Sequence, residues 1–196
     1  TYTQAASATG WGYRDLAHDG TYLYAGCNNV FYQIDPSDGS VVSEATHALG
    51  ITIRALAYDS ASGSFFTGDF SSDIFEFTYD GVSVTQVRSF NLGLTGKYGM
   101  AWDDVSPGGP FLWVFDQIGT PASTLVQADV SVVGSEVLTG VSHQLALGTG
   151  LTDQTAGGLF LSTDFTFGKI ALGCFLQGTP TDSFVAVELG DFATWI

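Results

Sequence analysis

Three of the five basic residues in this 196-residue chain occupy corresponding places, where they would bind an anion or form ion pairs. Arg14, Arg54 and Lys97 each lie at or next to the start of a short apolar segment that recurs along the chain. Two acidic residues, Asp69 and Asp116, recur later in the same repeat. If the recurring segments lie at the centre of the fold, these five side chains would line a central channel. The basic residues would then form ion pairs with Asp15, Asp69 or Asp116, or bind a sugar or an anion at the channel mouth.

The two cysteines also fall on the repeat. We align Cys27 and Cys174 with Asp69 and Asp116, just after the second strand of each unit. If the first and last units are neighbours in a ring, the cysteines would form a disulfide, provided that their Cα atoms come within about 7 Å. Two buried reduced thiols are the alternative. A metal site of two thiolates and two carboxylates is a third possibility, but the local Cys-x-x-Cys spacing of zinc sites is absent. We therefore predict neither a metal nor a cofactor.

No catalytic motif accompanies these residues. His18, His47 and His143 have neither the spacing of a metal-binding helix nor a partner for nucleophilic chemistry. The sequence contains no Gly-x-Ser-x-Gly elbow, phosphate-binding loop or dinucleotide fingerprint. The sequence therefore predicts a protein that is not an enzyme.

The recurring segment divides the chain into four units. Its copies are residues 14–19, 54–59, 98–103 and a degraded fourth at 157–162. The units cover approximately residues 13–50, 53–92, 97–147 and 155–196, and together form one domain over residues 1–196. Residues 1–12 precede the first unit and would supply an outer strand that closes a ring.

Each unit continues with a turn and three more short apolar segments. Second strands are expected at 21–26, 64–68, 111–115 and 169–173; third strands at 30–35, 73–78, 124–129 and 184–189; fourth strands at 41–44, 82–87, near 136–138 and at 192–196. Four strands per repeat predict an all-β, β-propeller-like domain of about four blades, each a four-stranded antiparallel sheet. A pair of packed sheets is the competing fold, because any all-β chain shows short strands and glycine-rich turns.

The charge of the chain restricts its partners. Twenty acidic residues against five basic ones give a formal charge of −15, which repels phosphate backbones and anionic lipids. We therefore predict no nucleic-acid partner. No apolar run approaches the length of about 18 residues that a membrane-spanning helix needs, so we also predict no membrane insertion.

Several of these segments carry a family resemblance. Residues 11–16, 19–24, 34–36, 98–103 and 106–115 resemble the propeller-like repeats of large secreted or surface proteins of Bacteroidota-type bacteria, which often carry a sorting domain for type IX secretion. The resemblance covers roughly residues 11–190 and implies an extracellular or cell-surface location, and a chain that is a segment of a longer precursor. It also implies O-glycosylation of Ser60, because Asp59-Ser60-Ala61 is similar to the short motif that such bacteria glycosylate.

Together these observations predict a non-catalytic extracellular module with a structural or binding role and a glycan as its ligand. Two alternatives stay open. The first is a subunit that associates with copies of itself into a filament or sheath through strand edges. The second is a carbohydrate-active propeller enzyme, which would need facing carboxylates about 5 to 10 Å apart.

Overall fold

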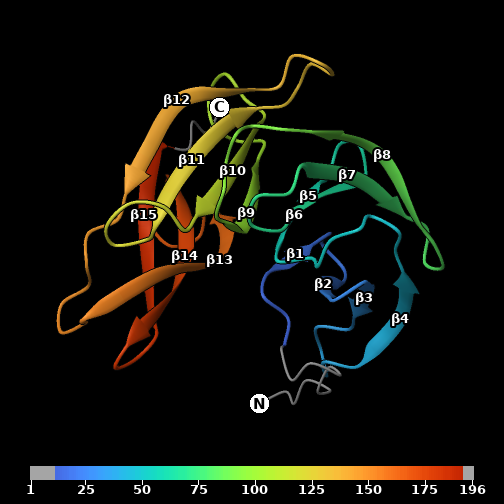
Figure 1. Cartoon of the computed structure of the whole chain (residues 1–196), viewed down its shortest axis with the longest axis horizontal. Coiled ribbons are helices and arrows are strands. Elements are labelled where there is room, and N and C mark those ends of the chain that lie inside the picture. The colour runs from blue at the N-terminus through green and yellow to red at the C-terminus, as the bar shows by residue number, and fades with distance from the viewer. Residues whose placement is uncertain (1–11, 192–196) are drawn as a thin grey trace.

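A computed structural model describes residues 12–191, which form four antiparallel sheets arranged as a four-bladed β-propeller (Figure 1). The first sheet contains β1 (Leu16–His18), β2 (Leu23–Cys27), β3 (Val30–Ile34) and β4 (Val41–Thr46). The second contains β5 (Ala55–Asp59), β6 (Ser64–Gly68), β7 (Ile74–Tyr79) and β8 (Val84–Phe90). The third contains β9 (Lys97–Asp103), β10 (Phe111–Asp116), β11 (Thr124–Asp129) and β12 (Val137–Gln144). The fourth contains β13 (Asp153–Ser162), β14 (Lys169–Thr179) and β15 (Ser183–Asp191).

The four sheets follow one another around the molecule, with their first strands nearest the middle (Figure 1). Each of β1, β5, β9 and β13 contacts the first strands of its two neighbours. The predicted fold class is therefore confirmed, and the packed-sheet alternative is wrong. The fourth strand predicted at residues 192–196, and the outer strand predicted within residues 1–12, fall outside the described residues except for Gly12. Residues 12–191 contain no helix that is long and apolar enough to cross a membrane.

Apolar clusters hold three of the four junctions between neighbouring sheets. Each cluster combines inward-facing residues of two consecutive sheets: the first with the second, the second with the third, and the third with the fourth. Phe31, Phe66 and Trp113 are among their fully buried members. Among residues 12–191 no such cluster joins the fourth sheet to the first. This last junction therefore depends on other contacts.

One pair of facing residues on the first and second strands follows the same pattern in three sheets and departs from it in the fourth. In the first three sheets a small residue faces an aromatic one, in the pairs Ala17–Tyr24, Ala57–Phe66 and Ala101–Trp113. In the fourth sheet the order is inverted, because Phe160 faces Gly173. A Cβ atom on Gly173 would lie 2.4 Å from the Phe160 ring, so the ring fills the space that an aromatic residue of β14 would otherwise take.

We expect Gly173→Ala to destabilise the protein by about 1 kcal/mol, because the half-exposed Phe160 ring must turn away from the added methyl group. In a Phe160→Ala background the same substitution should cost almost nothing. Urea unfolding of the four proteins of this double-mutant cycle measures the coupling. Equal costs of Gly173→Ala in both backgrounds would contradict the pairing.

In the first three units, the acidic residue that ends the recurring segment shapes the turn that follows it. Asp19 accepts the backbone N–H of Thr21 at 2.7 Å, and Asp59 accepts that of Ala61 at 2.9 Å. Asp103 does the same for Ser106 at 2.9 Å. These carboxylates satisfy turn amides that would otherwise lack a partner, which explains why the recurring segments end in Asp.

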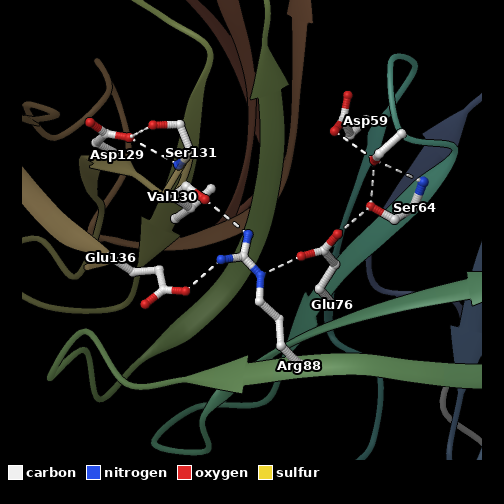
Figure 2. Close-up of polar contacts among 9 residues, drawn as sticks. Asp59, Ser64, Glu76, Arg88, Asp129, Val130, Ser131 and Glu136 are labelled. Carbon is white, nitrogen blue, oxygen red and sulfur yellow. Dashed lines mark hydrogen bonds and ion pairs between the residues drawn. The ribbon is translucent and has the colours of Figure 1, made fainter. Parts of the chain in front are cut away.

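Arg88 joins the second sheet to the third (Figure 2). Its guanidinium group lies between two carboxylates, with Nε 2.5 Å from Glu76 on the adjacent strand β7 and Nη1 2.5 Å from Glu136 at the start of the β12 segment. Nη2 donates a third hydrogen bond, of 2.9 Å, to the backbone carbonyl of Val130. Glu76 also accepts a hydrogen bond from Ser64 at 2.8 Å. All three guanidinium nitrogens are thus used at one junction.

Asp15 lies at the centre of the ring and binds the other three sheets. Its carboxyl group accepts backbone N–H groups of Leu56 at 2.9 Å, Met100 at 2.8 Å and Leu159 at 3.1 Å, one from each other first strand. The side chain is 6% exposed. Burial raises the pKa of Asp15 to about 8, against the opposing effect of these amides. Asp15 therefore supplies the contact between the fourth sheet and the first that an apolar cluster supplies elsewhere.

Candidate functional site

A cavity of about 610 Å³ opens where the first strands of the four sheets begin. We call this side of the ring the starting face and this space the mouth cavity. Residues near the start of all four first strands line it: Arg14, Arg54, Tyr98, Asp153 and Thr155. The end of β14 and the loops that follow second strands on the same face complete it with Phe70, Gln117, Gln177, Gly178, Thr179 and Asp182. The cavity therefore lies over the end of the channel that the sequence predicted as a ligand site.

Two arginines are fixed in the mouth cavity by neighbouring side chains. Arg54 donates from Nε to Asp69, and its guanidinium carbon lies 4.5 Å from the centre of the Phe70 ring. Arg14 donates to the hydroxyl oxygen of Tyr98. Within residues 12–191 the side chain of Arg54 makes no second hydrogen bond, so its terminal nitrogens can bind a ligand. The predicted ion pair between Arg54 and Asp69 is thus observed, and Arg14 lines the same cavity as Arg54. Their role in binding a ligand stays a prediction.

Phe70 adds an aromatic surface that sequence reasoning missed. The residue is 38% exposed, and its backbone φ of 38° is in the left-handed region that residues other than glycine rarely adopt. Two backbone hydrogen bonds with Lys97, of 3.1 and 3.3 Å, hold it there. Such a conformation costs about 1 to 3 kcal/mol and marks functional sites more often than others. No sequence signal reveals it, because the usual marker of a positive φ is glycine.

Lys97 and Asp116 do not line the mouth cavity, which corrects the prediction that they face the channel. Lys97 is 2% exposed and donates from Nζ to the Leu94 carbonyl at 2.7 Å, whereas Asp116 is fully buried. Burial lowers the pKa of Lys97, against the charge of Asp116. Burial raises the pKa of Asp116, against the charge of Lys97. The charge of each side chain therefore partly offsets the effect of burial on the other, and the backbone of Lys97 holds the loop that carries Phe70.

The disulfide predicted between Cys27 and Cys174 is not formed: in the described structure both are buried thiols. The predicted alignment of the fourth sheet with the first was wrong by two residues. Counted from the Phe160–Gly173 pair, the position equivalent to Cys27 is Leu176, while Cys174 faces Leu159. Cys174 packs in the apolar cluster between the third and fourth sheets, and burial raises the pKa of its thiol to about 12.

The remaining candidate residues lie apart from the mouth cavity. Ser60 is in the exposed turn after β5, where its hydroxyl donates to Asp104 at 3.3 Å, and its glycosylation stays a prediction. His143 stacks on Trp113 at 5.9 Å, and His18 lines a separate cavity along the first strands. Within residues 12–191 no group of three or more His, Cys, Asp and Glu side chains is placed to hold a metal ion.

The polar lining of the mouth cavity suits hydroxyl groups as well as charge. Gln117 and Gln177 each donate from Nε2 to the carbonyl of Ala156, at 2.8 and 3.1 Å, which fixes both amides while their side-chain oxygens remain acceptors. With the Arg54 terminal nitrogens as donors and the Phe70 ring as a flat apolar surface, the cavity offers the three kinds of contact that a sugar ring needs.

Comparisons with known proteins identify the fold and no family. No protein-family model matches the chain, and no curated protein matches its sequence. Among solved structures, it is similar to a chain in the crystal structure of a mitotic checkpoint complex, with a TM-score of 0.51 and 13% sequence identity. The match covers 85% of this chain and 47% of the other, so this chain spans about half the length of that one. At this identity the likeness concerns the fold alone.

Proposed function

We propose that this chain is a non-catalytic binding module that holds a carboxylate-bearing sugar residue, such as a uronic acid, in the mouth cavity. The observation that carries the proposal is the exposed Phe70 ring, held in a left-handed backbone conformation directly beside the Arg54 guanidinium group. A pyranose ring would stack on Phe70, and its carboxylate would bind the Arg54 terminal nitrogens. The amide oxygens of Gln117 and Gln177 would accept hydrogen bonds from its hydroxyl groups.

Local charge supports this choice of ligand. The chain as a whole carries a formal charge of −15, so it repels polyanions. Two of its five basic residues nevertheless line this one cavity, where they offset the carboxylates of Asp153 and Asp182. A ligand with one carboxylate among many hydroxyl groups would gain the arginine contact at a small repulsive cost. The extracellular location of the module stays a prediction.

The test is calorimetric titration of the protein with glucuronic acid and with glucose. We expect glucuronic acid to bind more tightly, and Phe70→Ala to weaken its binding about tenfold, which corresponds to about 1.4 kcal/mol. Phe167→Ala is the matched control, because Phe167 is fully exposed and is not part of the cavity lining. No binding of glucuronic acid, or equal effects of the two alanine variants, would refute the proposal.

A further inference from the structure

A second cavity of about 640 Å³ adjoins the mouth cavity on the starting face. Its polar lining comes from the turn between β2 and β3, which supplies Asn28 and Asn29, and from the connection between β4 and β5, which supplies His47 and Thr52. Asp69 also lines it. Because Asp69 accepts the Nε–H of Arg54, this ion pair forms the wall that the two cavities share.

His47 provides a neutral donor in the second cavity. It is 5% exposed, and burial lowers its pKa, against the effect of the nearby Asn28 carbonyl. Nδ1 accepts the backbone N–H of Leu49 at 3.4 Å, which places the ring hydrogen on Nε2. Within the described part of the chain, Nε2 has no hydrogen-bond partner. A buried donor without an acceptor costs about 1 to 3 kcal/mol, which a ligand oxygen would recover once the ring turns Nε2, now shielded from solvent, toward the cavity.

The two cavities differ in charge. The mouth cavity contains two guanidinium groups, of Arg14 and Arg54, and two carboxylates, of Asp153 and Asp182. The lining of the second cavity has no arginine or lysine: its polar groups are two amides, a hydroxyl group, a neutral imidazole and the carboxylate of Asp69, which is already paired with Arg54. These groups match the hydroxyl groups of an uncharged sugar and would not attract a second carboxylate.

We infer that the two cavities are adjoining subsites for an oligosaccharide. Its acidic sugar residue would lie in the mouth cavity, and the neighbouring uncharged sugar residue would accept a hydrogen bond from His47. This inference rests on the proposed function, because it extends the same ligand across the Arg54–Asp69 pair.

The experiment compares glucuronic acid with cellobiouronic acid, a disaccharide of glucuronic acid and glucose, by calorimetry on the whole chain. We expect the disaccharide to bind about tenfold more tightly. His47→Ala should remove this gain and leave the affinity for glucuronic acid within about twofold. His47→Gln, which keeps a donor, should retain part of the gain, and His143→Ala is the control for loss of a histidine elsewhere.

The outcomes separate the two proposals. If neither sugar binds, the proposed function fails and the subsite inference fails with it. If glucuronic acid binds but the disaccharide binds no more tightly, or if His47→Ala and His143→Ala affect the gain equally, only the second subsite is overturned. Thermal unfolding of His47→Ala and His47→Gln confirms that the variants are folded when they are titrated.

Discussion

Asp15→Ala should destabilise the protein by about 4 kcal/mol, because three buried N–H groups would lose their acceptor at once. These amides belong to the other three sheets, at Leu56, Met100 and Leu159. The neighbouring positions cannot substitute for the lost side chain, since a Cβ atom on Gly99 would lie 2.5 Å from a backbone oxygen. Denaturant unfolding, with the free energy extrapolated to water, measures the effect.

The control is Asp38→Ala, which removes a carboxylate that accepts one backbone N–H in an exposed turn. It should cost much less, and equal costs would show that Asp15 has no special place in the ring. The pH dependence provides a second check. Because the pKa of Asp15 is raised to about 8, its protonated form stabilises the fold fully below pH 4. This contribution is lost as the pH rises to about 8. Asp15→Asn should lack that part of the pH dependence.

Arg88→Met should cost about 3 kcal/mol, because it leaves the carboxylates of Glu76 and Glu136 partly buried without a counter-charge. The hydrogen bond to the Val130 carbonyl would also be lost. Since Arg88 joins two sheets, the variant should weaken the junction between them. Thermal or urea unfolding measures the loss.

Two controls separate the buried charges from the loss of a long side chain. Adding Glu76→Gln and Glu136→Gln to Arg88→Met removes the uncompensated charges and should restore most of the stability. Lys169→Met removes a cation that also contacts two carboxylates, Glu188 and Asp191, but at an exposed site, and should have a much smaller effect. If the triple variant is no more stable than Arg88→Met, unpaired charge is not the cause.

Most strands could be predicted because turn residues and alternating apolar residues leave strong local signals. The predicted bounds of β6 and β11 agree with the structure. The predicted start of β8 was two residues early. Its turn extends further than Asp80-Gly81, because the Asp80 carboxylate accepts the N–H groups of both Val82 and Ser83, at 2.9 and 2.7 Å. Local side-chain hydrogen bonds thus move strand ends in ways that composition does not reveal.

The fourth sheet was harder to predict. β13 begins at Asp153, four residues before the predicted opening segment, and contains a register irregularity between Ala156 and Leu159. β14 continues to Thr179, whereas the sequence predicted its end at residue 173. The misplaced alignment of Cys174 follows from these differences, because counting residues along the repeat takes no account of a β-bulge.

The candidate site could be predicted only in part. The positions of Arg14, Arg54 and Asp69 followed from the repeat, because equivalent residues of a ring meet at one face. The burial of Lys97 could not be predicted in this way, since the sequence does not show which carbonyl accepts a hydrogen bond from its ammonium group. Asp15 was predicted as an ion-pair partner of the basic residues in the channel, whereas its partners are backbone amides, which every residue except proline offers.

The central position of Asp15 also bears on how the chain reaches this fold. Each sheet forms by hairpins between neighbouring segments, whereas the hydrogen bond from Leu159 to Asp15 joins residues 144 apart in sequence. Contacts at such separation form late, because the loop between them must close first. We therefore expect ring closure to follow the transition state, so that Asp15→Ala accelerates unfolding more than it slows folding in stopped-flow experiments. One side chain would then set how long the closed ring persists.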